Sequence, residues 1–212
     1  MVNNFKLIIL LLLAFFIPIT LSNDLPDHVP SLLKYNPEHS HLLRLVAAIS
    51  EQGHFSKKKI SNESSHLILK NYLNTLDSQK IYFTQSDINY FQRYRYKIDD
   101  ALKNGNLEPI FDIFRIYRLR VQQRIEYSIK IINSTNSFLV DDEYDFSREN
   151  VKWQKDVSIL DTSWEKKSKN DLLSILLAGQ EINTAKKTLN KRYQKFLNRI
   201  NNYESNDVID IF

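Results

Sequence analysis

Glycine is scarce in this sequence of 212 residues, and that scarcity limits what the chain can fold into. The only three glycines, Gly53, Gly105 and Gly179, lie far apart. Loops that cradle phosphates or dinucleotides need clustered glycines, because the backbone must approach the ligand closely, so such sites are excluded. β-Sandwiches and barrels need many tight turns, which this chain cannot supply. Cysteine is absent, which excludes disulfides, thiolate metal sites and cysteine nucleophiles.

Hydrophobic residues recur every three or four positions through most of the sequence, a spacing typical of amphipathic helices. The clearest case is the segment 108–132, in which Pro109 suits the first turn of a helix. The pattern predicts an all-α domain of six to seven amphipathic helices. The expected helices cover 41–52, 64–78, 86–103, 108–132, 157–178 and 183–202, and a seventh begins at Ser205.

The helix ends also have recognisable signals. Each glycine stands where a helix is expected to stop, since a left-handed residue ends a helix without strain. Thr84 or Ser86 is expected to cap the third helix. In the first helix the apolar face is predicted to consist of four residues, Leu42, Leu45, Val46 and Ile49.

The amino terminus has the pattern of a secretory signal peptide, expected over residues 1–22. Lys6 precedes the apolar run 7–19, and small residues suit a cut after Ser22. A retained membrane anchor is the alternative, but the run is shorter than the ~20 residues a spanning helix needs. We therefore expect a periplasmic protein, with association with the inner membrane as a further expectation.

The remaining sequence divides into an extended lead-in and one helical domain. The lead-in covers residues 23–38 and the helical domain covers 39–212, with an irregular acidic linker near 134–150. Strand-like alternation is limited to 137–140. The last helix has barely begun when the sequence stops at residue 212, which suggests a fragment or a truncated gene.

Residues that could carry chemistry are few, and we predict no catalytic residue, no metal site and no cofactor. No Gly-x-Ser-x-Gly sequence is present. The histidines do not form a His-Glu-x-x-His pattern, and we expect them at the surface. One acidic run resembles the opening of a calcium loop but lacks the required Gly and Glu, which favours a solvated loop. These residues are His28, His39, His41, His54 and His66, and Asp141, Asp142, Glu143 and Asp145.

Two charged patterns are candidates for contacts. Basic residues spaced four apart, opposite the apolar stripe of 183–202, form a basic ridge that is either a solvated face or a docking surface. An acidic partner protein or anionic lipid would suit it, whereas the export signal argues against nucleic acid. Asp171 lies on an apolar helix face and is expected to form an ion pair with Lys167, with exposure at a helix end as the alternative. The ridge consists of Lys187, Lys191, Lys195 and Arg199.

Four arginines also crowd one helix, at Arg115, Arg118, Arg120 and Arg124. At 100° per residue they point in several directions, so we expect them to flank the apolar stripe without forming one patch.

Six segments, taken in order, resemble the N-terminal helical domain of the bacterial tail-specific (carboxy-terminal processing) protease family. They read LDSQKIYF from Leu76, SDINYFQRYRYKIDDAL from Ser86, QRIEYSI from Gln123, DDEYDFSRE from Asp141, WEKKSKNDLLSILLAG from Trp164 and TLNKRY from Thr188. The resemblance covers roughly 61–212.

The resemblance implies a periplasmic serine endopeptidase whose PDZ domain and serine-lysine dyad lie downstream of the helical domain. It therefore implies that this chain is inactive alone, and that its partners are those downstream domains and an adaptor protein. The alternative is a stand-alone secreted helical protein that binds a partner, or an inactive remnant. We also expect an isolated domain of this kind to leave part of its apolar surface exposed.

Overall fold

The protein is all-α in the residues that the structure, a computed structural model, describes: 32–53, 59–139, 143–148 and 151–212. This confirms the predicted fold class. The predicted signal peptide lies outside these residues. None of the described helices is both long enough and apolar enough to span a membrane. The elements are α1 (Pro37–Gly53), α2 (Asn62–Leu76), α3 (Gln85–Phe91), the 3₁₀-helix η1 (Gln92–Tyr94), α4 (Ile98–Asn104), α5 (Glu108–Ser134), α6 (Val157–Leu177), α7 (Ile182–Asn201) and α8 (Ser205–Ile211).

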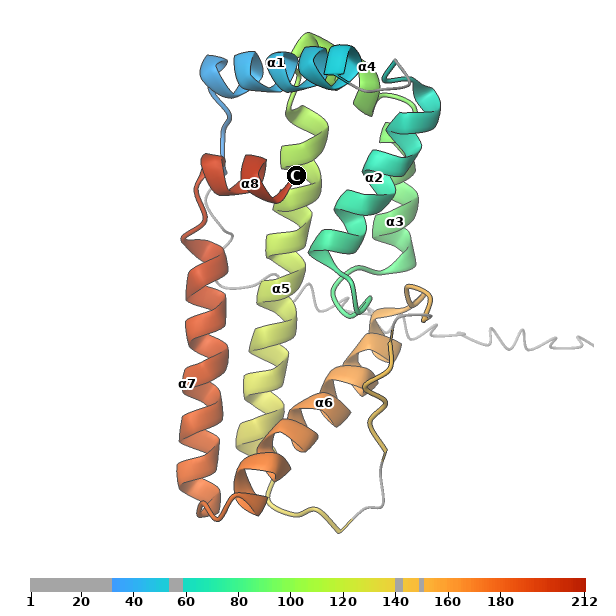
Figure 1. Cartoon of the computed structure of the whole chain (residues 1–212). Coiled ribbons are helices and arrows are strands. Elements are labelled where there is room, and N and C mark those ends of the chain that lie inside the picture. The colour runs from blue at the N-terminus through green and yellow to red at the C-terminus, as the bar shows by residue number, and fades with distance from the viewer. Residues whose placement is uncertain (1–31, 54–58, 140–142, 149–150) are drawn as a thin grey trace, which may run out of the picture.

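The helices are arranged around α5, which runs along most of the elongated molecule (Figure 1). Towards the end of α5, α6 and α7 pack against it and against each other, so the three form a bundle. Around its beginning lie the shorter helices, with α1 crossing the top of the molecule above α8 (Figure 1). At 27 residues, α5 is about 40 Å long and therefore links the two parts.

The apolar side predicted for the helix over 108–132 is the side of α5 that is buried in the core. Ile110, Phe114, Val121 and Ile125 are all buried, as is Ile132 near the end of the helix. Pro109 occupies the first turn, as expected. Burial of this stripe supplies most of the stability of a helix of this kind, since intrinsic propensity contributes little.

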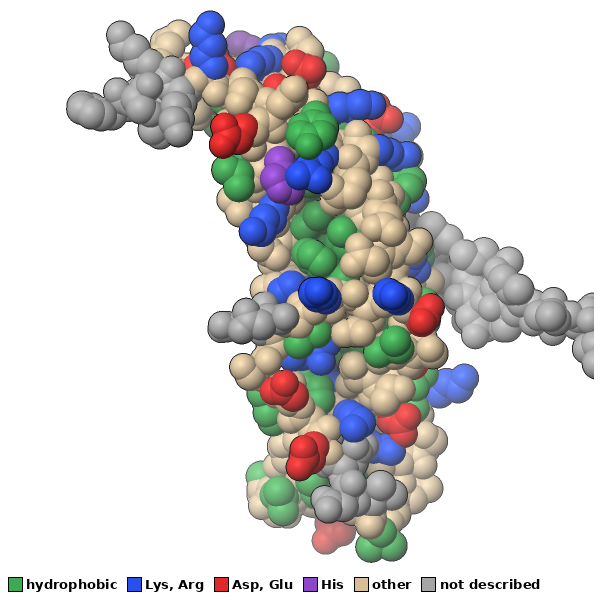
Figure 2. Space-filling model, turned by 90° about the vertical axis from the view of Figure 1, so that its right-hand side faces the viewer, with side chains coloured by type: hydrophobic (Ala, Val, Ile, Leu, Met, Phe, Trp, Pro, Cys, Tyr) green, Lys and Arg blue, Asp and Glu red, His purple; other side chains and the backbone are tan. Residues whose placement is uncertain are grey.

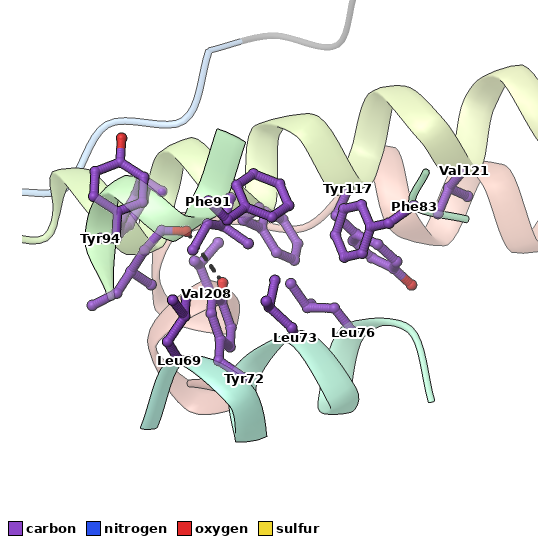
Figure 3. Packing of buried hydrophobic residues seen from close by; sticks show 14 of the residues in the cluster. Leu69, Tyr72, Leu73, Leu76, Phe83, Phe91, Tyr94, Tyr117, Val121 and Val208 are labelled. Atoms are coloured by element: carbon purple, nitrogen blue, oxygen red, sulfur yellow. Dashed lines mark hydrogen bonds between the residues drawn. The ribbon is translucent and has the colours of Figure 1, made fainter. Parts of the chain in front are cut away.

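Aromatic rings fill the space between α2 and α5, as Figure 3 shows. Phe83 and Phe91 lie edge to face, with ring centroids 5.2 Å apart, and Phe83 also contacts Tyr117. The Tyr72 hydroxyl donates a hydrogen bond to the backbone oxygen of Ile110 at 3.2 Å. This bond satisfies a polar group that would otherwise be costly to bury.

The single helix predicted over 86–103 is wrong, because the chain turns between α3 and α4. Thr84 is the N-cap of α3 and forms a capping box with Asp87, which settles the choice between Thr84 and Ser86. The helix then tightens into η1, and α4 starts anew at Ile98. The Ile98 amide donates to Ser65 Oγ of α2 at 2.9 Å. A side chain from another helix therefore stabilises the new start, which local sequence could not indicate.

The apolar face predicted for the first helix is also wrong. The described core covers Leu43 and Ala47 of α1 instead, whereas Leu42, Leu45, Val46 and Ile49 are each about half exposed. α1 packs on α4, where Gly105 lies so close that an added Cβ would be 2.6 Å from the backbone oxygen of Ser40. Small residues allow this close approach, so the smaller apolar face is the one that is buried.

The connection between α5 and α6 has no regular structure in its described residues, and 137–139 form no strand. The last helix, although short, has partners. Val208 of α8 is fully buried, and the ring of Phe212 lies 5.1 Å from that of Tyr72. Asn206 of α8 also contacts His39 of α1.

Candidate docking surface

The four residues of the predicted basic ridge are all exposed along α7. Among the described residues, none of the four forms an ion pair, and Arg199 lies 5.3 Å from the ring centroid of Phe196. The helix contains no Asp or Glu at all. The charge of the ridge is therefore not neutralised by acidic side chains of the same helix.

The packing of α7 explains why the ridge faces outwards. Ala185, Leu189, Leu197 and Ile200 are buried, and α7 uses this side to contact α5 and α6. Helical geometry then places residues 187, 191, 195 and 199 on the opposite side. By contrast, acidic and basic side chains are interspersed on the face of the molecule shown in Figure 2.

Asp171, Lys167 and Tyr193 meet where α6 packs against α7. Lys167 Nζ and the Tyr193 hydroxyl each donate a hydrogen bond of 2.6 Å to Asp171 Oδ2. Burial, followed by the charge of Asp171, raises the pKa of Tyr193 far above its ordinary value. The phenol therefore stays protonated and donates to the carboxylate, so the three groups hold α6 against α7.

Three of the four arginines of α5 contact neighbouring helices, whereas Arg115 pairs with Asp112 of its own helix. Arg120 forms two hydrogen bonds with Asp87 of α3, at 2.8 and 3.0 Å, and Arg124 pairs with Asp161 of α6. Arg118 is buried and donates to the backbone oxygen of Asn201 at the end of α7, 3.0 Å away. The four arginines thus form no single patch, and these three bind α5 to its neighbours.

Among the described histidines, placement differs from the prediction at one position, and His28 and His54 lie outside the described residues. His41 is exposed, but His39 is buried, so the expectation that all histidines lie at the surface is wrong. The Asn36 amide donates to His39 Nδ1 at 3.3 Å, and His39 Nε2 lies 2.6 Å from Asn206 Oδ1. The imidazole of His39 is buried because it lies between the start of α1 and α8.

No cluster of three or more potential metal ligands occurs in the part of the chain that the structure describes. Of the acidic run, Asp141 and Asp142 lie outside that part. Glu143 and Asp145 lie in the connection before α6, beside a shallow cavity of about 430 Å³.

Sequence reasoning missed Asp77, a buried acid that organises the loop after α2. Its carboxylate accepts hydrogen bonds from the backbone amides of Ile81, Tyr82 and Phe83, at 2.8 to 3.3 Å, and from the indole of Trp153 at 3.0 Å. Burial raises the pKa of Asp77, and these four donors oppose the rise. The sequence did contain a signal for this site, because Asp77 stands four residues before the apolar triplet 81–83.

Comparison with known proteins identifies the helical domain. The family model described as the tail specific protease N-terminal domain matches residues 45–212. The tail-specific protease of Haemophilus influenzae is 26% identical over 162 residues, which are 76% of this chain but 23% of that relative. The chain therefore spans about a quarter of the length of this curated relative. Because the family model matches most of the sequence, the chain belongs to the tail-specific protease family and contains its N-terminal domain.

Proposed function

We propose that this chain is the non-catalytic N-terminal scaffold of a periplasmic tail-specific serine endopeptidase, and that it docks an acidic partner protein on α7. Residues 1–22 would direct its export. In the family, cleavage is implied to belong to a serine-lysine dyad downstream, so the role of this domain is to hold and position other parts of the assembly.

The exposed cationic side of α7 is the observation that carries the docking role. Long side chains that lack an acidic neighbour on their own helix attract an oppositely charged surface and increase its rate of association. The helix that carries the ridge is held in place, because the other side of α7 is fixed in the bundle by buried Leu189, Leu197 and Ile200. No backbone entropy of α7 therefore has to be lost when a partner binds.

Charge reversal on the ridge tests the proposal. The probe is a fluorescently labelled, glutamate-rich helical peptide, and affinity is measured by anisotropy at low and high salt. The variant Lys191→Glu with Lys195→Glu should fold normally, since both residues are exposed. It should bind about tenfold more weakly, because two attractive pairs become repulsive.

A matched control separates the ridge from net charge. Lys152→Glu with Lys155→Glu makes the same change in charge at exposed positions before α6. It should retain most of the affinity. Equal losses in the two variants would refute a localised docking surface on α7.

A further inference from the structure

Two reciprocal hydrogen bonds close the start of α1. Asn36 Oδ1 accepts from the His39 amide at 3.0 Å, and the Asn36 amide donates to His39 Nδ1 at 3.3 Å. This is the arrangement of a capping box, in which the side chain at the third helical position returns to the residue before the helix. We call this pair of bonds the α1 cap. Glu or Gln usually supplies the returning acceptor in a capping box, whereas the α1 cap uses an imidazole.

The contacts of His39 require a neutral ring. Because Nδ1 accepts from the Asn36 amide, the single proton of the neutral imidazole lies on Nε2. Nε2 is 2.6 Å from Asn206 Oδ1 of α8 and donates to it. A second proton would turn Nδ1 into a donor that faces the N–H of Asn36. The ring is 8% exposed, so water cannot easily replace the lost acceptor.

Two other helices begin with capping boxes that do not have this sensitivity. Thr84 and Asp87 cap α3, and Glu204 and Asp207 cap α8. A carboxylate in a model peptide keeps its charge down to about pH 4, whereas an imidazole takes up a proton at about pH 6.5. Of these three helix starts, the α1 cap is therefore the one whose acceptor is lost on mild acidification.

The charges around His39 do not compensate a protonated ring. Among the described residues, no acid forms an ion pair with His39. The carboxylates of Glu204 and Asp207 favour the imidazolium, but each binds a backbone amide at the start of α8, and Glu204 is exposed. The positive ends of α1 and α8 oppose it. The titratable and charged side chains of the neighbouring segments are Lys34 and Tyr35 before α1; Glu38, His41 and Arg44 on α1; Asp99, Asp100 and Lys103 on α4; and Glu204, Asp207 and Asp210 on α8.

We propose that the α1 cap is a pH-sensitive joint, which opens when His39 is protonated and frees residues 32–36 from the first turn of α1. These residues run from the start of α1 towards α8 (Figure 1). The rest of the domain stays folded, because Leu43 and Ala47 of α1 and Val208 of α8 remain buried. The cap is complete while the ring is neutral, and it is lost as the pH falls through the range in which the ring is protonated. No residue of the ridge on α7 takes part, so this proposal and the docking proposal fail separately.

Solvent exchange of the Asn36 amide, measured by NMR on residues 23–212, tests the joint. The protection of this amide is its exchange rate in an unstructured peptide divided by its rate in the protein, at the same pH. Protection should be about tenfold lower at pH 5.5 than at pH 7.5, because loss of a cap removes the bond that protects the amide. The Phe114 amide of α5 should show no such change, since Phe114 is buried in the core.

Three variants make the result specific to His39. His39→Gln and His39→Glu supply acceptors that suit a capping box and do not titrate between pH 5.5 and 7.5, so the response to pH should disappear. His41→Gln changes an exposed histidine two residues away and should respond as the wild type does.

Four results would overturn the proposal. The first is equal protection of the Asn36 amide at both pH values in the wild type. The second is a response that survives in either His39 variant, and the third is a response that is lost in His41→Gln. The fourth is a parallel loss of protection at Phe114, which would mean that the whole domain responds to pH.

Discussion

Removal of the Asp77 carboxylate should destabilise the domain more than any other single change to a polar side chain described above. Asp77 is 1% exposed and accepts hydrogen bonds from three consecutive backbone amides and one indole. In Asp77→Ala, all four donors lose their acceptor. The loop after α2 and the segment around Trp153 would both lose their anchor.

The size of the loss in stability depends on how many of the four donors can bind water once the carboxylate is gone. The amides of Ile81 and Phe83 belong to buried residues, whereas Tyr82 and Trp153 are half-buried and can be solvated. Two donors left buried and unsatisfied cost about 1–3 kcal/mol each. We therefore expect Asp77→Ala to lower the free energy of unfolding by about 2–6 kcal/mol, a large part of the ~5–15 kcal/mol of a typical domain.

Urea unfolding of residues 23–212, followed by tryptophan fluorescence and far-ultraviolet circular dichroism, measures this loss. Asp77→Asn keeps one acceptor oxygen without the charge and should lie between the wild type and Asp77→Ala. Trp153→Phe removes a single donor and should cost about 0.5–1.5 kcal/mol. The slope against urea should stay unchanged in all three variants.

A loss below about 1 kcal/mol in Asp77→Ala, at an unchanged slope, would refute this reasoning. It would mean that water replaces the carboxylate at every donor. The loop from Asp77 to Phe83 would then be held by apolar burial alone.

Two further predictions concern backbone geometry and pH. Gly105→Ala should cost about 1–3 kcal/mol more than Gly179→Ala, measured by urea unfolding. Both glycines have positive φ, but only at Gly105 would the added Cβ meet backbone, so equal costs would contradict the packing of α1 on α4. For Asp112, burial raises the pKa, but hydrogen bonds from Arg115 and Tyr94 outweigh burial and lower it. Its stabilising contribution should be complete above the unfolded pKa of about 3.9 and lost as pH falls through the lower folded pKa. The stability difference between the wild type and Asp112→Asn should therefore shrink on acidification, and a constant difference would contradict this assignment.

Helix positions were predictable where one apolar stripe dominated. α5 and α7 each have one wide stripe, and in both the predicted side is the buried one. α1 has two apolar faces, and periodicity favours the larger. Which face is buried depends on the close approach at Gly105, a contact between distant parts of the sequence.

The break between α3 and α4 was not predictable for a related reason. The sequence there contains neither proline nor glycine, and the apolar spacing continues through it. The new helix begins where Ser65 accepts its first amide, and this partner lies 33 residues away. The positions of the ridge residues on α7 follow from helical geometry alone, so the sequence could indicate that surface. The exposure of Leu42, Leu45, Val46 and Ile49 on α1 could be known only from the fold.

The contacts of α8 with the first described residues have a consequence for the order of folding. Ser205 Oγ donates to the backbone oxygen of Lys34, and His39 contacts Asn206; these pairs are separated by 171 and 167 residues. Closing such long loops costs conformational entropy before any contact offsets it. Among the described helices α1 is synthesised first, yet its start acquires these partners only when α8 has been made. Until α8 packs, the segment from Lys34 to His39 lacks these hydrogen bonds. During that time chaperones and proteases can reach it.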